Sequence, residues 1–196
     1  MKDFVYLASQ SPRRRQLLEQ IGVRYELLLA ATDEDAESLE EALPGEAPLT
    51  YVKRVTQLKL EAAVKRMQAR SLKPATVLCA DTTVALGRVI FGKPENTQDA
   101  VRILKTLSGQ THRVLTAVAV ASGRRRSMRV SVSKVTFAPM TSSEIKAYVA
   151  SGEPFGKAGA YGVQGMAAAY ISEIRGSYTG IMGLPLFETA LLLKNI

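Results

Sequence analysis

An apolar run that leads directly into a polar turn and a helix start is the feature that most constrains the fold. Residues Phe4 to Ala8 are typical of a short buried strand. Ser11 suits a helix N-cap, because its hydroxyl can accept a bond from the first free amides, and Pro12 suits the first helical position. Gly22 is typical of a helix end. The first part of the chain is therefore predicted to be a strand, a polar turn and a helix.

Three consecutive arginines, Arg13 to Arg15, fall in the first turn of that helix. The positive end of the helix dipole disfavours cations there, whereas its unpaired N–H groups suit an anion. Arginine at this position makes sense if a phosphate group is held, because the guanidinium fork matches phosphate oxygens. The alternative is a capped helix with a solvated basic face.

Further along the chain, apolar runs of strand length alternate with stretches of helical periodicity. Runs 84–86 and 89–91 flank a Gly-Arg pair, which predicts a hairpin. Thr141 and Glu144 have the spacing of a capping box. Helices that alternate with long strands, hairpins included, predict an α/β fold with a mixed sheet. The remaining expected strands are 25–29, 76–80, 112–121, 127–137 and 166–174, and the expected helices are 49–70, 97–107, 141–151 and 185–195.

Composition points to a folded, cytoplasmic protein. A chain of 196 residues that are 46% hydrophobic can bury a real core, so wholesale disorder is not expected. One cysteine cannot form an internal disulfide, and no secretory N-region precedes the first expected strand. No apolar run approaches the ~20 residues of a membrane span. We therefore expect no membrane partner.

The formal net charge is +8, from 26 Lys and Arg against 18 Asp and Glu, which favours an anionic partner. The charge is uneven, because Asp33 to Glu46 is acidic whereas Arg124 to Arg129 is basic. Such an acidic segment is of little use in binding a duplex, so we expect no stable nucleic-acid partner. A nucleic-acid-binding module and a non-catalytic nucleotide sensor remain alternatives to an enzyme acting on a phosphorylated small molecule.

Carboxylates occur at two places where they could serve chemistry. Asp33, Glu34 and Asp35 are adjacent in an expected loop and could bind a hard cation through oxygen, although a solvated acidic loop is the simpler interpretation. Asp81 follows the expected strand 76–80, and ligands of α/β sheets gather at the carboxyl ends of strands. The alternative for Asp81 is an ordinary turn.

Two lysines are candidates for binding phosphate. Lys93 follows the predicted hairpin, which can return it close to Asp81. Lys59 lies on the expected helix 49–70, where the sequence alone favours one more surface lysine. His112 is the only histidine and is expected to be structural. A zinc site built on several histidines is therefore excluded, and no serine–histidine or cysteine–histidine pair is expected.

Motifs that follow one another along nearly the whole chain resemble those of one family. Ser9-x-Ser11-Pro12-Arg13-Arg14 resembles the signature of the Maf family of nucleotide pyrophosphatases. Each motif alone is weak, but the ordered set is specific. The further matching stretches are Arg54 and Lys59, Ala80-Asp81-Thr82, Gly92-Lys93-Pro94, Leu107-Ser108-Gly109, the run from Lys157 to Gly165, Gly176-Ser177-Tyr178 and Gly183-Leu184-Pro185-Leu186.

The resemblance implies a fold and a reaction. The implied fold is α/β and inosine triphosphatase-like, an elongated twisted mixed sheet flanked by helices, with two lobes and a central cleft. Residues 1–196 would form one domain. The implied reaction is cleavage of a nucleoside triphosphate between its α- and β-phosphates, which gives the monophosphate and pyrophosphate. A homodimer is implied as well.

The resemblance also implies catalytic roles. Asp81 would accept the proton of the attacking water, and Glu34 would stand near the catalytic centre. Asp81 and Glu34 would hold a divalent metal cation, Mg²⁺ or Mn²⁺. Lys59 and Lys93 would be catalytic cations that face the phosphates.

Substrate binding is implied for Ser9, Arg13, Arg14, Thr82 and Gln164. Arg13, Thr82 and Gln164 are the residues found in the branch of the family that acts on uracil and thymine nucleotides. The implied substrates are therefore dTTP and UTP, with modified uridine triphosphates as a further class.

Overall fold

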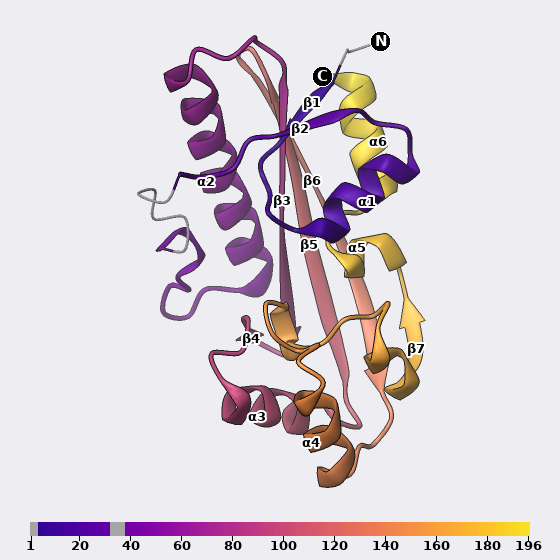
Figure 1. The fold of residues 1–196 in the computed structure, drawn as a ribbon. Coiled ribbons are helices and arrows are strands. Elements are labelled where there is room, and N and C mark those ends of the chain that lie inside the picture. The colour runs from indigo at the N-terminus through magenta and orange to yellow at the C-terminus, as the bar shows by residue number, and fades with distance from the viewer. Residues whose placement is uncertain (1–3, 32–37) are drawn as a thin grey trace.

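The computed structural model describes residues 4–31 and 38–196, which form one seven-stranded mixed sheet flanked by helices (Figure 1). The strands are β1 (Val5–Leu7), β2 (Tyr25–Leu27), β3 (Thr76–Leu86), β4 (Val89–Phe91), β5 (Thr111–Ser122), β6 (Arg125–Phe137) and β7 (Ile171–Arg175). The α-helices are α1 (Pro12–Gln20), α2 (Pro48–Ala69), α3 (Thr97–Leu107), α4 (Ser142–Ala150), α5 (Tyr178–Met182) and α6 (Leu186–Asn195). Three 3₁₀ helices are η1 (Ser38–Glu40), η2 (Ala158–Ala160) and η3 (Met166–Tyr170).

Three long neighbouring strands form the centre of the sheet, whose order is β2-β1-β3-β5-β6-β7 with β4 also paired to β3. β3 runs antiparallel to β5, and β5 runs antiparallel to β6. β1 pairs in parallel with both β2 and β3, so the predicted mixed sheet is confirmed. Nearly all side chains of β5 are buried, as a strand covered on both faces requires.

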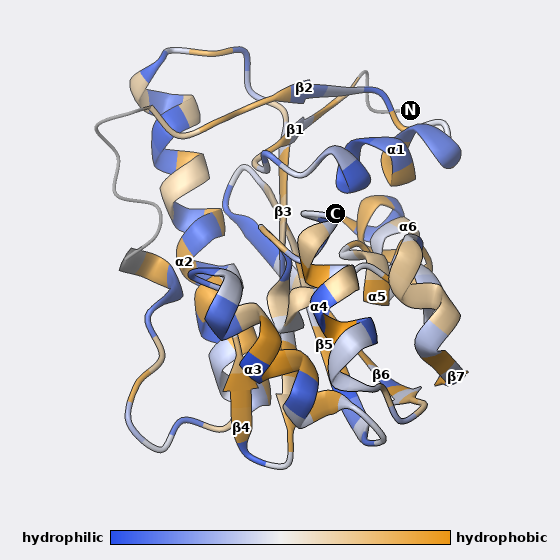
Figure 2. Ribbon diagram, turned by 60° about the horizontal axis from the view of Figure 1, so that its bottom comes forward, coloured by the Kyte–Doolittle hydropathy of each residue, from blue (hydrophilic) through white to orange (hydrophobic). Residues whose placement is uncertain are grey.

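Helices cover both faces of this sheet. Val77 of β3 packs with Leu60 of α2, on one face. Leu78, the next residue, packs with Leu17 of α1 and Leu192 of α6, on the other face. Figure 2 shows hydrophilic and hydrophobic residues mixed along α2, as expected for a helix with one face on a sheet and one in solvent.

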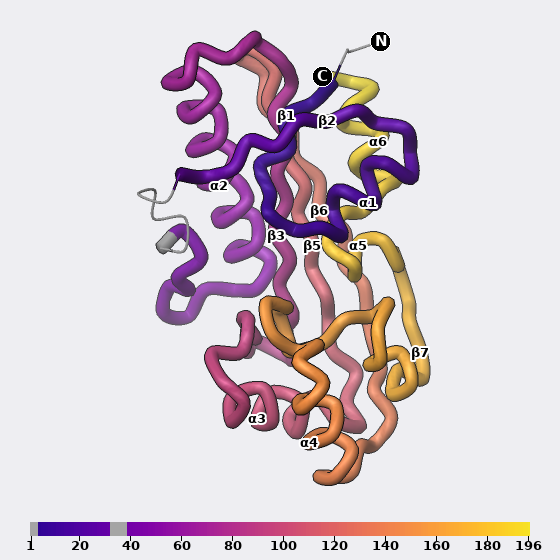
Figure 3. The backbone as a smooth tube through the Cα atoms, in the orientation of Figure 1, coloured from indigo at the N-terminus to yellow at the C-terminus, as the bar shows by residue number. Residues whose placement is uncertain are grey.

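The middle of β3 has an open side. β1 pairs with residues 76–78 of β3, and β4 pairs with residues 84–86. Within the described chain, residues 79–83 therefore have no strand partner on that side. Figure 3 shows the chain leaving β1 at this level and crossing the sheet towards α1 and α5. Asp81 lies in the middle of β3 and not after its end, which corrects the prediction, because the strand continues as one arm of the hairpin.

Several local predictions are confirmed. The hairpin turn between β3 and β4 contains Gly87 with φ of 60°, a left-handed value that favours glycine. Thr141 and Glu144 form the capping box of α4.

None of the helices in the described residues combines the length and the apolar character needed to cross a bilayer.

The expected strand 166–174 is wrong in its first half, where the chain forms η3 before β7 begins. The carboxylate of Glu153 accepts the backbone N–H groups of Met166 and Ala167, which holds these amides away from a strand ladder. Gly165 permits this arrangement, because a Cβ there would overlap the Glu153 carboxylate. A distant carboxylate therefore decides the conformation of this apolar stretch.

Candidate active site

A cavity of about 530 Å³ lies beside the open middle of β3. Its walls come from the β1–α1 turn, α2, β3, the β4–α3 connection, segment 156–164 and the end of α5, so elements from both ends of the long sheet meet there. The volume is within the range of ligand pockets. The predicted site residues that line it are Ser9, Arg13, Arg14, Lys59, Asp81, Thr82, Lys93 and Gln164. The remaining predicted residue, Glu34, lies outside the described residues.

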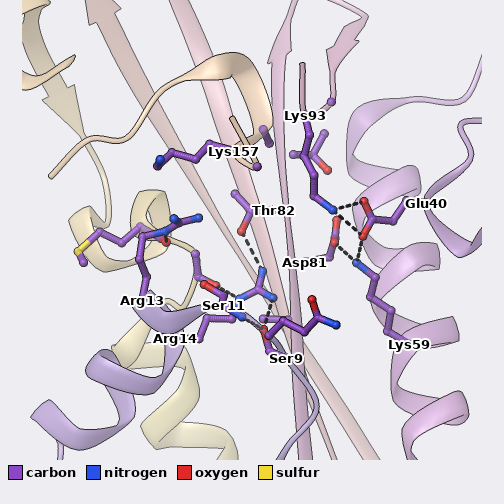
Figure 4. A pocket seen from close by; sticks show the side chains of 18 of the residues that line it. Ser9, Ser11, Arg13, Arg14, Glu40, Lys59, Asp81, Thr82, Lys93 and Lys157 are labelled. Atoms are coloured by element: carbon purple, nitrogen blue, oxygen red, sulfur yellow. Dashed lines mark hydrogen bonds and ion pairs between the residues drawn. The ribbon is translucent and has the colours of Figure 1, made fainter. Parts of the chain in front are cut away.

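Two lysines and two carboxylates form one connected cluster in this cavity (Figure 4). Lys59 Nζ lies 2.6 Å from Asp81 Oδ1 and 2.7 Å from Glu40 Oε1. Lys93 Nζ lies 3.0 Å from Glu40 Oε2. Lys93 was predicted to lie close to Asp81, and the structure links the two through ion pairs with Glu40 and Lys59.

The charges of this cluster stabilise one another. Burial alone would lower the pKa of Lys59, but Asp81 and Glu40 outweigh burial and raise it. Burial likewise disfavours the ionised form of Glu40, but Lys59 and Lys93 hold its pKa below the ordinary value. At neutral pH Lys59 is therefore cationic and Glu40 anionic.

The segment that carries Glu40 is fastened to α2. Tyr51 Oη donates to Glu40 O at 2.7 Å. Arg54 donates to the carboxylate of Glu46 through Nε at 2.8 Å and through Nη2 at 2.7 Å, and its Nη2 also donates to Glu41 O at 2.8 Å. Arg54 therefore positions the segment that enters the site. The sequence analysis missed Glu40, because nothing distinguishes it from the other acidic residues of that stretch.

Arg14 is anchored at the other side of the cavity by three elements. Its Nε donates to Gly183 O at 2.7 Å, its Nη1 to Ser9 Oγ at 3.0 Å, and its Nη2 reaches Thr82 Oγ1 at 3.5 Å. Ser11 occupies the N-cap position of α1, but its side chain caps no amide and its own N–H donates to Ser9 Oγ at 3.2 Å. Ser11 therefore leaves the first amides of α1 uncapped, an arrangement compatible with the predicted binding of an anion there.

A third cation at this side, Lys157, was not among the predicted site residues. Arg13 Nε donates to Met182 O at 3.2 Å. Lys157 also lines the cavity, donates to the Glu153 carbonyl, and extends over the same region as Arg13 in Figure 4. Burial, and then the charge of Arg13, lower the pKa of Lys157. The glycine-rich motif that begins at Lys157 was a sequence signal that could have identified this residue.

Histidine and cysteine are often used as proton carriers and nucleophiles, but His112 and Cys79 are both buried and structural. Burial lowers the pKa of His112 to about 4, and its Nε2 lies 2.8 Å from Tyr161 Oη. His112 is therefore neutral at pH 7, in keeping with the predicted structural role. Burial raises the pKa of Cys79 to about 12, so its thiol stays protonated.

The carboxylates of the cluster fit a metal only together with a substrate. Within the described residues, no three His, Cys, Asp or Glu side chains meet as a ligand set. Asp81 and Glu40 supply two carboxylates joined through Lys59. Mg²⁺ is commonly held by one or two carboxylates together with substrate phosphates, and this donor set is compatible with that mode.

Comparisons with known proteins show which proteins this chain is similar to. A protein of Polaromonas sp. strain JS666 named dTTP/UTP pyrophosphatase is 67% identical over 192 residues, covering 98% of this chain and 95% of that protein. One of the same name from Albidiferax ferrireducens is 64% identical, covering 100% of this chain and 98% of that protein. The solved structure of VC0702 from Vibrio cholerae aligns with a TM-score of 0.48 at 10% identity, covering 100% and 97%. Residues 4–196 match the Maf-like protein family, and the chain therefore belongs to that family.

Proposed function

We propose that this protein is a nucleoside triphosphate pyrophosphatase that hydrolyses dTTP and UTP, and modified uridine triphosphates, to the monophosphate and pyrophosphate. The observation that carries the proposal is one cavity that joins an Asp81–Lys59–Glu40–Lys93 cluster to the half-buried Arg14. Relatives that are 67% and 64% identical over nearly the whole chain and are named dTTP/UTP pyrophosphatase support this reaction.

In the proposed reaction, Asp81 accepts a proton from the water that attacks the α-phosphate. Lys59 holds Asp81 by an ion pair and remains charged, since its pKa is raised. Lys93, Arg14 and the first amides of α1 bind the negative charge that develops on the departing pyrophosphate. Binding and charge stabilisation thus come from cations on three different elements or connections: α2, the β4–α3 connection and α1.

A divalent cation, Mg²⁺ or Mn²⁺, is part of this proposal, and when bound it would neutralise charge on the phosphate oxygens. Asp81 would hold it together with a second carboxylate. The family resemblance implies Glu34 for that position, whereas the described residues offer Glu40, which Lys59 joins to Asp81. We propose Glu40 as the second carboxylate in addition to Glu34.

Selection of the base is assigned to Gln164, Thr82 and Arg13, which line the cavity. Uracil and thymine present the acceptors O2 and O4 on either side of the donor N3–H. The Gln164 carboxamide can accept from N3–H and donate to O4. The 5-methyl group of thymine needs only space. Because the Gln164 amide can also flip to suit cytosine, we propose that Thr82 fixes the orientation of this amide that suits uracil and thymine.

The same proposal includes a single-domain, cytoplasmic enzyme that forms a homodimer and binds nucleic acid only weakly. Light scattering of the purified protein tests the homodimer. A salt titration with duplex and single-stranded nucleic acid tests the binding alternative, and turnover separates an enzyme from a nucleotide sensor.

The decisive experiment measures pyrophosphate release from canonical and modified nucleoside triphosphates with Mg²⁺ and with Mn²⁺. We expect UTP and dTTP to give the monophosphate and pyrophosphate. A nucleoside diphosphate with orthophosphate as the products would overturn the reaction. Binding of UTP without any turnover would instead support the nucleotide sensor.

A further inference from the structure

We propose that Glu153 is a positioning residue that holds the turn carrying Gln164 and thereby sets the preference of the site for uracil and thymine over guanine. This inference rests on the proposed function, because it concerns how that site reads its base. Neither Glu153 nor its partner Tyr148 is among the residues that line the cavity, whereas Gln164 is, so both act through the turn.

Residues 162–165 form a tight turn that presents Gln164 to the cavity. The Gly165 N–H donates to Gly162 O at 3.0 Å, so Val163 and Gln164 are the two central residues of the turn. Val163 is 4% exposed and packs in the apolar core, whereas Gln164 is exposed and lines the cavity. The position of the Gln164 carboxamide therefore depends on how firmly this short stretch of backbone is held.

One pair of side chains holds both ends of the turn. Just after the turn, Glu153 Oε2 accepts the Met166 N–H at 2.8 Å and Glu153 Oε1 accepts the Ala167 N–H at 3.4 Å. At the start of the turn, the Gly162 N–H donates to Tyr148 Oη at 3.4 Å. Tyr148 Oη in turn donates to Glu153 Oε1 at 2.8 Å, so the two ends are joined through one carboxylate and one hydroxyl.

The turn lies directly against the side chains that hold it. A Cβ at Gly165 would overlap the Glu153 carboxylate, and a Cβ at Gly162 would lie 3.1 Å from Cε of Lys157. Tyr148 belongs to α4, is 2% exposed and packs in the apolar core, so the pair is anchored there. The glycines therefore let the backbone of the turn approach a fixed support closely.

The contacts of Glu153 require an ionised carboxylate. Burial disfavours the ionised form, but the Met166 N–H and the Tyr148 hydroxyl help to outweigh burial, and the pKa of Glu153 is lowered. All three partners of the carboxylate donate, and a carboxylate can accept from each of them. A glutamine amide cannot, because whichever way it turned, its NH₂ group would face the N–H of Met166 or of Ala167. Replacing Glu153 by glutamine should therefore loosen the turn at almost unchanged side-chain volume.

The test compares Glu153→Gln with Tyr148→Phe, which removes the hydroxyl that joins the carboxylate to Gly162. The chain offers matched controls away from the cavity, since Tyr25 Oη donates to Glu19 Oε1 at 2.7 Å in a surface pair of the same kind. The readouts are kcat/KM for UTP and GTP, and the affinities of their non-hydrolysable α,β-imido analogues. We expect the UTP-to-GTP preference to fall about tenfold in Glu153→Gln and to fall also in Tyr148→Phe, because a displaced side chain loses its alignment with the base. The preference should stay unchanged in Glu19→Gln and in Tyr25→Phe.

An unchanged preference in folded Glu153→Gln, with or without a loss of thermal stability, would show a purely structural role and overturn the proposal. If that variant does not fold, the preference of Tyr148→Phe decides in the same way. In a Gln164→Ala background, Glu153→Gln should have no further effect on the preference, and an equal effect there would also overturn the proposal. Since the analogue affinities need no turnover, a wild-type protein that prefers the UTP analogue but does not hydrolyse UTP contradicts the proposed function and leaves the test of Glu153 intact.

Discussion

Lys59 Nζ lies 2.6 Å from Asp81 Oδ1, so the proposed phosphate-binding lysine and the proposed general base hold each other in one ion pair. The pair is mostly buried, with side-chain exposures of 20% and 11%. Such a pair holds both groups in fixed positions, and Asp81 together with Glu40 raises the pKa of Lys59, which stays cationic at neutral pH. It also means that substitution of either residue changes the environment of the other.

Replacing Asp81 tests the base. Asp81→Asn keeps the shape of the side chain but removes its charge and basicity, so we expect turnover of UTP to fall by ~10²–10⁴-fold. Single-turnover pyrophosphate release measures this loss, and circular dichroism checks the fold. Near wild-type turnover in a folded Asp81→Asn protein would remove Asp81 from the mechanism.

Replacing Glu40 tests the second carboxylate. Glu40→Gln removes the charge that joins Lys59 and Lys93, and we expect the Mn²⁺ concentration for half-maximal activity to rise by about tenfold or more. Direct Mn²⁺ titration in the presence of a non-hydrolysable UTP analogue gives a second readout. Glu41→Gln is the matched control, because it alters an exposed neighbour. Equal metal dependence in the two variants would contradict a metal-holding role for Glu40.

Lys93 should act on every nucleotide alike. Its Nζ faces the carboxylate of Glu40, and the triphosphate it is proposed to bind is the same whatever the base. We expect Lys93→Ala to lower kcat/KM for UTP, dTTP and GTP by the same factor, whereas the exposed Lys53→Ala should leave all three unchanged. A Lys93→Ala protein in which only the UTP-to-GTP ratio moves would contradict this assignment.

Gln164 should carry the choice of base. A glutamate at 164 still accepts from N3–H but sets an anion against O4, whereas guanine offers two donors, N1–H and its amino group. We expect Gln164→Glu to lower kcat/KM for UTP and dTTP relative to guanine nucleotides by an amount on the order of 10²-fold. The ratio of specificity constants is the measurement, and a constant ratio would mean that Gln164 does not read the base.

His112 should make stability depend on pH. Its pKa is about 4 in the folded protein against an ordinary 6.5, so the unfolded chain takes up a proton between these values and the folded chain does not. The free energy of unfolding should therefore fall by about 3 kcal/mol as pH decreases from 6.5 to 4, and be fully present above 6.5. Urea unfolding at pH 7 and 4.5 should show a clearly smaller loss in His112→Gln than in the wild-type protein. The same loss in both proteins would assign the pH dependence to other groups.

The sequence by itself determined the local elements and the family. Spacing of apolar residues located the long helices and strands, Gly87 marked the hairpin, and Thr141 with Glu144 marked a helix start. These features depend on neighbours within a few residues, which is why local patterns predict them. Eight of the predicted site residues line one cavity. They could be predicted because they belong to sequence motifs that follow one another in the order typical of the family.

Only the tertiary structure decided how those residues meet. Asp81 borders the cavity because β1 ends opposite Leu78 and β4 begins to pair at Val84, and both are matters of strand pairing. Glu40 lies in the site because residues 40 and 41 are hydrogen-bonded to Tyr51 and Arg54 of α2, and no local sequence pattern predicts these contacts. The turn that carries Gln164 is held by Glu153 and by Tyr148 of α4, which come before it in the chain and reach it only in the folded protein. Such contacts join residues far apart in the chain, and packing and hydrogen bonding across the whole fold select them.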